Sequence, residues 1–459
     1  MKIDINRLHH LFFIGVAGSG MSALAQYFAG MGKSVSGSDR YFGTGVADDV
    51  QKKLETAGIR CFEQNGEGIV ADLDLVVVST AVEDTVPEVQ KARQLNIPII
   101  KRSELLALIV DNRKTIAIAG TSGKSTTSAM LFEILDYAGW EPGIISGAGL
   151  IKLIRDGKIG NALTGKGEWL VIEADESDGS IVQYKPEVGV LLNIDKDHQE
   201  IDTLLNIFQV FKENTRGAFI VNQSHPLAAG LSKDFHHDFS VDEVSNAGYK
   251  ATNFRQQGLH IHFMINGVPF MLQTIGEHNM ENALAAVAVA ATLGVDVSVS
   301  AEALAQYEGI YRRHQVIGNK NGVWLIDDYA HNPAKCAASI RACREIAPKV
   351  IAWFQPHGYG PTRFLRDDFV KEISSALRPK DEIWMSEIFY AGGTAVKDIS
   401  AGDLIEAIKQ DGKHAYFVEQ RDDFPDRVRN HLTGNCVLLL MGARDPSLEQ
   451  FAGQVWNSL

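Results

Sequence analysis

The sequence predicts an α/β protein of three domains. These are a Rossmann-like first domain, a central domain with a parallel sheet and a phosphate loop of the P-loop ATPase type, and a Rossmann-like α/β last domain. One observation is length, because 459 residues are too many for one hydrophobic core. The other is a repeated pattern of short β-branched apolar runs that end in glycine or polar residues, often followed by helical patterns. Such runs are typical of parallel strands buried on both faces. The runs are Leu11–Ile14, Leu75–Val78, Thr115–Ala119, Trp169–Ile172, Val188–Leu192, Val323–Ile326, Val350–Phe354 and Val437–Met441.

The three domains are expected at residues 1–112, 113–312 and 313–459. The first begins with a strand, a glycine turn and a helix, and the second repeats this order from Thr115. A helical stretch, NALAAVAVAATLG, stops at Gly294 near the end of the second domain. The third domain is again α/β from about Val323. Ligands bind at the carboxyl ends of the strands in such sheets, so the residues after each run are the candidates for chemistry.

Composition excludes several classes of protein. No apolar run approaches the ~18–20 residues of a membrane span, and MKIDINRLHHLFFIGVAG runs into a glycine turn and not into a signal-peptide cleavage site. The formal net charge of −13 argues against a surface that coats nucleic acid. The scattered cysteines are expected to be reduced thiols. We therefore expect a cytoplasmic protein that binds neither nucleic acid nor membrane. As partners we expect small molecules, and as oligomeric state a monomer or weak homodimer.

A first glycine turn lies in FFIGVAGSGMS, where a strand enters a turn and a helix. The order of glycines is GxxGxG and not the GxGxxG of dinucleotide-binding folds. Asp39 ends a second strand roughly twenty residues on, where a ribose-binding acid would lie. Alone, this pattern suits any nucleotide, NAD included, so a dehydrogenase is a competing hypothesis. That hypothesis leaves the next two motifs unexplained.

The sharpest motif is a second glycine loop, GTSGKST at residues 120–126. Glycines allow backbone N–H groups to surround a phosphate, and the following helix adds its positive N-terminal end. Lys124 can reach the β- and γ-phosphates, and the Ser125 hydroxyl can bind Mg²⁺. The spacing is two residues shorter than in the standard P-loop. Strand, lysine and helix together favour a phosphate site over an incidental turn.

Two polar segments follow the next predicted strands. EADESD at residues 173–178 places four carboxylates at a strand end, which is costly unless a cation or solvent relieves their repulsion. An isolated acidic loop would be solvated surface, but a phosphate-binding domain needs an acid that binds Mg²⁺. The next strand ends in NIDKDH, so His198 would lie at the same edge of the sheet.

Taken together and in order, the motifs resemble the Mur ligases over nearly the whole chain, and among them the branch that joins L-alanine to UDP-N-acetylmuramate. The motifs are GxxGxGMS with GSD, VVVSTAV, IPIIKRSELL, GTSGKSTT, EADESD, NIDKDH, GEHNMENALAA, YRRH, DDYAHNP and FQPHGY. A single motif would mean little, but all of these motifs occur in this order, which makes the resemblance specific.

The resemblance implies roles for individual residues, with Lys124, Glu173 and His198 as the catalytic set. The UDP-sugar would be bound by Gly18, Ser19, Gly20, Met21, Asp39, Ser79 and Arg102. ATP would be bound by Gly120, Thr121, Gly123, Lys124, Ser125, Thr126, His278, Asn279, Asn282, Arg313 and Asp328. Mg²⁺ would be held by Ser125, Glu173 and His198, and the acceptor by His331 and Arg363.

The implied reaction is amide-bond formation driven by ATP. The sugar's carboxylate attacks the γ-phosphate, which gives an acyl phosphate and ADP, and the acceptor amine then displaces phosphate through a tetrahedral intermediate. Mg²⁺ and Lys124 would offset the charge on the transferring group. Because three domains must meet around the ligands, domain closure is expected.

The chain departs from the alanine-adding pattern where the acceptor binds. That branch carries a segment resembling HRYTRTR after FQPH, whereas Gly358 and Pro361 replace two of its arginines here and Arg363 remains. Such arginines can hold a carboxylate with two hydrogen bonds. Ala330 and Asn332 also differ from DDYGHHP, and Ser122 stands where the family often has His. A related ligase with another acceptor, such as the tripeptide-recycling enzyme, therefore stays open.

A third hypothesis is a catalytically silent ATP-binding regulator on the same fold. The presence of Lys124, Glu173 and His198 argues against it. NAD(H) binding to the first domain would favour the dehydrogenase, and ATP binding without turnover would favour the regulator.

Overall fold

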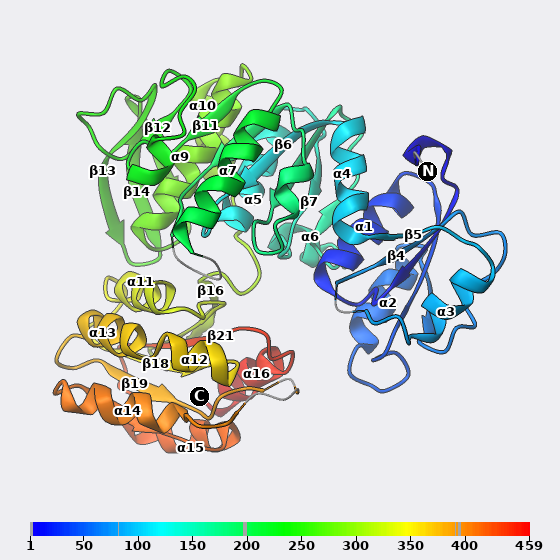
Figure 1. Ribbon diagram of the computed structural model, residues 1–459. Helices are drawn as coiled ribbons and strands as arrows, with labels where there is room; N and C mark the ends of the chain where they lie inside the picture. Colours follow the sequence, from blue (N-terminus) through cyan, green and yellow to red (C-terminus); the bar gives the residue numbers. More distant parts are fainter. Residues whose placement is uncertain (1–2, 81, 196–199, 391, 393–395) are drawn as a thin grey trace. The chain divides into compact units, whose positions relative to one another are not determined.

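The computed structural model describes residues 3–80, 82–195, 200–390, 392 and 396–459 (Figure 1). The chain forms two compact units. One contains residues 1–253, 263–270 and 281–310, and the other contains residues 254–262, 271–280 and 311–459. The predicted buried strands are confirmed, each within one or two residues of its expected limits.

The first sheet is parallel, with strand order β3-β2-β1-β4-β5. Its faces are covered differently. Leu11 and Phe13 pack in a cluster with Leu24 and Phe28 of α1, whereas Phe12 and Ile14 pack with residues around α3. The elements are β1 (His10–Ile14), α1 (Ser19–Gly30), β2 (Ser34–Asp39), α2 (Asp48–Thr56), β3 (Arg60–Glu63), β4 (Leu75–Val78), α3 (Pro87–Gln94), β5 (Ile99–Lys101) and α4 (Arg102–Asn112), after a 3-10 turn at Ile5–Arg7.

The second sheet has strand order β11-β10-β6-β9-β7-β8 and is parallel except for the β7–β8 pair. Strand β6 lies between β9 and β10, so the loops after these three strands share one edge. The elements are β6 (Lys114–Ala119), α5 (Lys124–Tyr137), β7 (Gly143–Ile145), α6 (Ile151–Arg155), β8 (Ala162–Leu163), β9 (Trp169–Ala174), a 3-10 turn (Ser180–Gln183), β10 (Val188–Leu191), α7 (Ile201–Asn214), β11 (Phe219–Val221) and α8 (Pro226–Ala229).

A four-stranded sheet with order β12-β13-β14-β15 was not among the expected elements. In its strand His260–Ile265, buried and less buried residues alternate, unlike the almost continuously buried runs of the expected strands. The turn after β14 contains Asn266 and Gly267, both with positive φ. The elements are β12 (Phe239–Ser240), β13 (Tyr249–Gln257), β14 (His260–Ile265), β15 (Val268–Leu272), α9 (Glu277–Thr292) and α10 (Val297–Leu304).

The last sheet has strand order β16-β17-β21-β18-β19-β20, with β16 antiparallel to β17 and the other pairs parallel. Residues of β18 alternate between two cores. Ala352 and Phe354 face the helices α11, α13 and α14, whereas Trp353 packs with Phe424 and Phe451 of α15 and α16. The elements are β16 (Gln315–Lys320), β17 (Val323–Asp328), α11 (Pro333–Cys343), β18 (Val350–Gln355), α12 (Tyr359–Phe364), α13 (Arg366–Ala376), β19 (Glu382–Met385), α14 (Ala401–Gln410), β20 (His414–Phe417), α15 (Phe424–Val428), β21 (Cys436–Gly442) and α16 (Leu448–Ser458), with 3-10 turns at Arg421–Asp423 and Arg429–His431.

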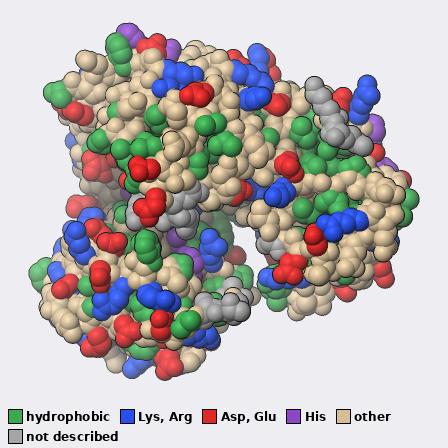
Figure 2. Space-filling model, viewed as in Figure 1, with side chains coloured by type: hydrophobic (Ala, Val, Ile, Leu, Met, Phe, Trp, Pro, Cys, Tyr) green, Lys and Arg blue, Asp and Glu red, His purple; other side chains and the backbone are tan. Residues whose placement is uncertain are grey.

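The surface carries charges of both signs. Figure 2 shows acidic and basic side chains interspersed over the visible face. In the part of the chain that the structure describes, no helix is long and apolar enough to cross a membrane. The cysteines are free thiols, and Cys336, Cys343 and Cys436 are buried.

Gly37→Ala should destabilise the first sheet. A Cβ at Gly37 would lie 2.6 Å from the Phe13 carbonyl oxygen and 2.7 Å from Val16 Cβ, so β1 and β2 would have to separate. Overpacking of this kind costs about 1–3 kcal/mol. Gly453→Ala is the matched control, because nothing lies within 4 Å of a Cβ added to this residue of α16. In urea unfolding, the midpoint concentration of Gly37→Ala should be lower than that of the parent, and the midpoint of Gly453→Ala should be equal to the parent's or higher. Equal midpoints for the two variants would contradict this.

Candidate functional site

Three loops meet at the carboxyl edge of the second sheet. In the register of the strands, Ala119 of β6 is level with Ala174 of β9 and Leu191 of β10. The loops that begin at Gly120, Asp175 and Leu192 therefore start side by side. This edge is where a parallel sheet binds ligands.

The phosphate loop is fixed by its glycines and by two asparagines. Gly120 has φ +136° and Gly123 has φ +86°, and Gly123 directly precedes α5. A side chain at Gly123 would collide with Asn282 Oδ1, and Asn282 also accepts a hydrogen bond from Thr127 Oγ1 at 3.3 Å. Asn193 Oδ1 accepts bonds from Thr121 Oγ1 (2.9 Å) and from the Ser122 backbone N–H (2.8 Å). The loop is thus preshaped with its N–H groups at a helix N-terminus.

Lys124 is held by the acidic loop. Its Nζ donates to the Gly120 carbonyl at 2.7 Å and to Glu176 Oε2 at 2.7 Å, and it lies 3.7 Å from Asp175 Oδ1. Burial alone would lower the pKa of Lys124, but the charges of Glu176 and Asp175 outweigh burial and raise it. The lysine is therefore a charged ammonium poised beside the phosphate loop.

Glu173 has a different environment from its neighbours in the acidic loop. Its Oε1 accepts hydrogen bonds from Ser146 Oγ at 2.5 Å and from the Gly147 N–H at 2.8 Å, so the loop after β7 fixes the carboxylate. Ser125 lies in the first turn of α5 and is buried. His198 lies outside the described residues.

A Mg²⁺ ion would find suitable donors here. Mg²⁺ prefers oxygen ligands and keeps several waters, so it needs few protein groups. Glu173 and Ser125 supply a carboxylate and a hydroxyl from β9 and α5. Among the described residues, three or more His, Cys, Asp or Glu side chains nowhere gather closely enough to hold a metal ion by themselves. These donors suit an ion that is bound jointly with phosphate oxygens.

The first sheet collects another set of predicted residues at its carboxyl edge. Asp39, at the end of β2, accepts the Ala17 N–H with Oδ2 at 3.0 Å and the Tyr41 N–H with Oδ1 at 3.0 Å, so its carboxylate ties the first glycine turn to the loop after β2. Gly18 directly precedes α1, which begins with Ser19, Gly20 and the buried Met21. Ser79 follows β4, and Arg102 follows β5.

Arg102 connects this edge with the acidic loop. A Cβ at Gly20 would lie 3.0 Å from Arg102 Cδ, so the arginine packs directly on the glycine turn. Its Nη2 lies 3.7 Å from Asp178 Oδ2. Asn161 Nδ2 donates to the Ser19 carbonyl at 2.8 Å. The first glycine turn and the phosphate-binding sheet are thereby joined within one compact unit.

A second group of predicted residues lies in the other compact unit. Ser339 Oγ bonds Asp328 Oδ2 and lies 2.9 Å from His314 Nε2, while the His314 backbone N–H donates to Asp328 Oδ1 at 3.3 Å. The His278 and His314 rings are 5.0 Å apart. Burial would raise the pKa of Asp328, but His314, the Ser339 bond and Arg313 hold it below its ordinary value. Asp328 is therefore an anion fixed by neighbours that the motif did not reveal.

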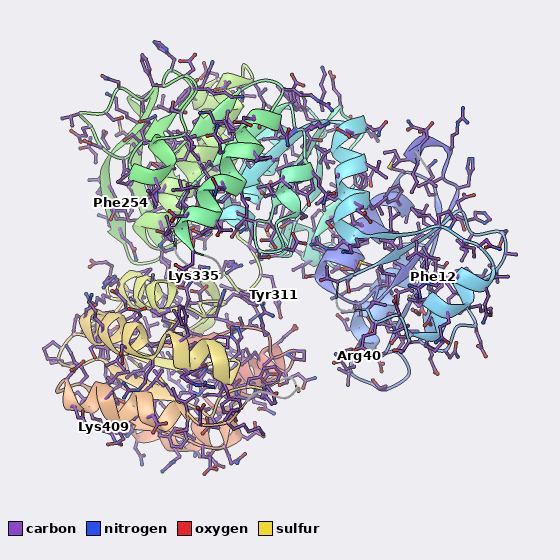
Figure 3. The ribbon with its side chains drawn as sticks, viewed as in Figure 1. Phe12, Arg40, Phe254, Tyr311, Lys335 and Lys409 are labelled. Carbon is purple, nitrogen blue, oxygen red and sulfur yellow. The ribbon has the colours of Figure 1, made fainter. Side chains whose placement is uncertain are left out.

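Arg313 projects from a strained turn. The residues on either side, Arg312 (φ +54°) and His314 (φ +47°), are both left-handed, which is costly for side chains other than glycine. Arg312 is locked by Asp327 Oδ2 at 2.8 Å and by the Gly442 carbonyl at 3.0 Å. The Arg313 guanidinium lies over the Tyr329 ring, 4.8 Å from its centroid. This turn follows Tyr311, which Figure 3 labels.

The two predicted acceptor residues have distinct partners. The His331 Nδ1–H donates to the Tyr329 carbonyl at 2.8 Å, which leaves Nε2 as an acceptor in the neutral ring. Burial lowers the pKa of His331 to about 3, helped by the charge of Lys335. Arg363 pairs with Asp398 at 2.9 Å and donates to the Val396 carbonyl at 3.4 Å.

Family models match most of the chain. The Mur ligase family catalytic domain matches residues 10–114, the Mur ligase middle domain residues 118–290, and the Mur ligase glutamate ligase domain residues 312–444. The UDP-N-acetylmuramate–L-alanine ligase of Carboxydothermus hydrogenoformans is 33% identical over 96% of this chain and 96% of that protein. The chain belongs to the Mur ligase family. The ligase of the same name from Methylobacillus flagellatus is 35% identical over 95% of this chain and 94% of its own.

Solved structures agree with this membership. The UDP-N-acetylmuramate-alanine ligase of Thermotoga maritima has a TM-score of 0.80 and 26% identity, over 98% of this chain and all of that one. A murein peptide ligase from Psychrobacter arcticus, at 22% identity and a TM-score of 0.67 over 98% of both chains, shares the fold. The predicted three-domain α/β architecture is that of the Mur ligases.

Several residues of this Mur ligase site carried no role in the sequence analysis. Glu176 holds Lys124, and Asn193 shapes the phosphate loop. Both lie in motifs that the sequence analysis had singled out, EADESD and NIDKDH, but one-dimensional spacing does not say which member points where. His314 belongs to the YRRH motif but had no assigned role, and Ser339 lies in no motif; both meet Asp328 across more than ten residues of sequence.

Acid should destabilise the unit that contains His278 and His331. Burial lowers the pKa of each to about 3, below the ordinary 6.5. Between these values the unfolded chain binds more protons, so the free energy of unfolding falls as pH drops through this window. His278→Gln cannot take up that proton, and its urea midpoint should fall less between about pH 7.5 and pH 5 than the parent's. His414→Gln, at the exposed first residue of β20, is the control. Parallel pH profiles for parent and His278→Gln would refute the assignment.

Proposed function

We propose that this Mur ligase uses ATP to form an amide bond between the carboxylate of UDP-N-acetylmuramate and L-alanine, through an acyl phosphate, in the cytoplasmic synthesis of peptidoglycan precursors. The observation that carries the proposal is Lys124, held at 2.7 Å by Glu176 on a preshaped phosphate loop. The support from relatives is similarity over nearly the whole chain to proteins with this activity in their names.

The proposed division of labour follows the three expected domains. Residues 1–112 bind the UDP-sugar, residues 113–312 bind ATP, and residues 313–459 bind the acceptor. The UDP-sugar lies at the first glycine turn, where Gly18, Gly20 and helix α1 offer backbone N–H groups to its phosphates. Arg102, packed on Gly20, adds a cation at the same edge. Ser19, Met21, Asp39 and Ser79 complete this set, with Asp39 shaping the turn.

ATP is the proposed ligand of the phosphate loop. Its phosphates lie against Gly120, Thr121, Gly123, Lys124, Ser125 and Thr126. The nucleotide's remaining contacts come from His278, Asn279 and Asn282 of α9, and from Arg313 and Asp328. Ser125, Glu173 and His198 are the proposed Mg²⁺ ligands. Bound there, Mg²⁺ would neutralise charge on the transferring phosphoryl group.

Lys124 carries the phosphoryl-transfer step. When ATP binds, the ammonium exchanges Glu176 for phosphate oxygens, which keeps the buried cation paired throughout. The sugar carboxylate oxygen forms a bond to the γ-phosphorus as the bond to the β-γ bridging oxygen breaks, and ADP leaves. The charge that develops on the transferring group is met by Lys124 and by the loop N–H groups.

The second step joins the acceptor. The amine nitrogen attacks the acyl carbon, and the tetrahedral intermediate collapses with loss of phosphate. The amine must lose a proton, which the departing phosphate or solvent takes up, and the bare Nε2 of neutral His331 can orient the amine by accepting a hydrogen bond from it. The lowered pKa of His331 keeps it in the neutral form at physiological pH.

A related ligase with another acceptor is the second candidate. Gly358 and Pro361 offer no cation at positions where an acceptor carboxylate would be bound. A longer acceptor, such as L-alanyl-γ-D-glutamyl-meso-diaminopimelate, is the alternative. In either case the partners are small molecules, the enzyme binds neither nucleic acid nor membrane, and it acts as a monomer or weak homodimer.

The test is ADP release from purified protein with ATP, Mg²⁺ and UDP-N-acetylmuramate. L-Alanine, glycine, L-serine and the tripeptide are supplied one at a time. Turnover dependent on L-alanine is expected. Turnover with another acceptor alone would replace the substrate and keep the mechanism, whereas ATP binding without turnover would favour a regulator.

Lys124→Met should lower kcat by roughly 10²–10³-fold, the effect of removing one preorganised electrostatic donor. Glu173→Gln should also lower turnover, and added Mg²⁺ should restore part of it if this carboxylate binds the ion. Lys158→Met, a charge loss at an exposed lysine of the same domain, is the control and should match the parent. Near-parental turnover by Lys124→Met would contradict its proposed role.

A further inference from the structure

The turn after β18 offers no cation of its own. Gly358 has φ +73°, and Pro361 Cδ would lie 3.3 Å from a Cβ added there, so the turn is closed around glycine. Its carbonyl accepts the Thr362 Oγ1 hydrogen bond at 2.8 Å as α12 begins. An acceptor carboxylate bound near this turn needs a positive charge from another segment.

Lys397 lies beside the same turn. Its Nζ is 5.8 Å from the ring centroid of Tyr359 and 5.4 Å from that of Tyr390, and the two rings meet edge to face at 5.4 Å. Tyr359 is the residue after Gly358, and Tyr390 lies beyond the end of β19. Among the described residues, no carboxylate forms an ion pair with Lys397, and its side chain is exposed. Two aromatic faces thus hold an ammonium that keeps its charge available to a ligand.

Arg363 fixes the backbone on both sides of Lys397. It donates to the Val396 carbonyl at 3.4 Å and pairs with the Asp398 carboxylate at 2.9 Å. Beyond them, Ile399 is buried and Ser400 starts α14 with a capping box. Arg363, Asp398 and Ile399 line one groove of about 370 Å³, so the segment after Lys397 forms part of its wall. The Arg363 guanidinium therefore positions Lys397 indirectly, through contacts with Val396 and Asp398.

His331 lies at the same edge of the last sheet as the two tyrosines. The His331 and His357 rings are 5.7 Å apart. His357 pairs with Phe389 across the ends of β18 and β19, and the Gly358 N–H donates to the Phe389 carbonyl at 2.9 Å. Tyr359 and Tyr390 follow directly on the two paired segments. His331, His357 and the tyrosine pair that holds Lys397 therefore lie at the carboxyl ends of β17, β18 and β19, within one compact unit.

We propose that Lys397, held over Tyr359 and Tyr390 and positioned by Arg363, binds the carboxylate of the acceptor whose amine lies at His331. The inference rests on the proposed ligase function and names a specificity-determining residue for it. Its ligand is the α-carboxylate of a single amino acid or the terminal carboxylate of a short peptide. Arg363 is a positioning residue in this arrangement.

The experiment compares Lys397→Met with the parent in the ADP-release assay. Loss of a charge-assisted contact to a carboxylate should raise the acceptor KM roughly ten- to hundred-fold, with kcat and the KM for ATP unchanged, because the contact is the same in ground and transition states. Lys397→Arg should restore most of the affinity. Lys409→Met, on α14 of the same domain and labelled in Figure 3, is the matched control.

Acceptors without a carboxylate make the test specific. The parent's preference for L-alanine over L-alaninamide should shrink in Lys397→Met by the same factor as the rise in KM. If the parent uses the tripeptide, the same comparison is made between the tripeptide and its carboxamide. The acceptor whose preference shrinks in Lys397→Met is the one whose carboxylate Lys397 binds. An unchanged preference would overturn the inference.

Arg363→Ala separates positioning from direct binding. If Arg363 acts through Lys397, the double variant Arg363→Ala/Lys397→Met has the KM of Lys397→Met alone, whereas additive effects would show that Arg363 contacts the acceptor itself. A parent without turnover on any acceptor would overturn the proposed function together with this inference. Turnover by the parent with an unaltered KM in Lys397→Met would overturn this inference alone.

Discussion

The register of three parallel strands is the constraint on which the rest of the site depends. Because β9 and β10 pair with β6 so that Ala174 and Leu191 are level with Ala119, three loops begin at one edge of the sheet. The glycine loop, the acidic loop and the Asn193 loop can then neutralise and shape one another. Lys124 illustrates the result, since its ammonium takes a carbonyl from its own loop and a carboxylate from the loop after β9. Buried charges of this kind are stable only when such partners are in place.

The same arrangement explains why acidic side chains in one loop have different tasks. Glu173, still within β9, is turned toward the loop after β7 by Ser146 and Gly147. Glu176, three residues later, reaches Lys124. Strand geometry, and not residue type, separates a carboxylate held by Ser146 and Gly147 from one that keeps a lysine charged.

Much of the fold could be predicted from the sequence because buried parallel strands consist of continuous apolar runs, as in Val350–Phe354. The sheet β12–β15 was missed because a strand such as His260–Ile265 alternates buried and less buried residues. Within the site, Lys124 was found because a phosphate loop requires local spacing. Asn193, His314 and Lys397 depend on neighbours brought together by strand order and by the pairing of the segments after β18 and β19. Such neighbours leave no local pattern. The roles of the predicted residues in substrate binding rest on the family resemblance and remain predictions.

The left-handed turn around Arg313 has a consequence for engineering. Glycine in place of Arg312 or His314 would relieve backbone strain of about 1–3 kcal/mol. The same change would remove either the lock onto Asp327 and Gly442 or the ring that lies against Asp328 and His278. Because removal of one partner of a buried ion pair costs about 3–5 kcal/mol, glycine at position 312 would lower stability although it relaxes the backbone. The usual replacement of left-handed residues by glycine is therefore a poor route to a thermostable variant at this turn.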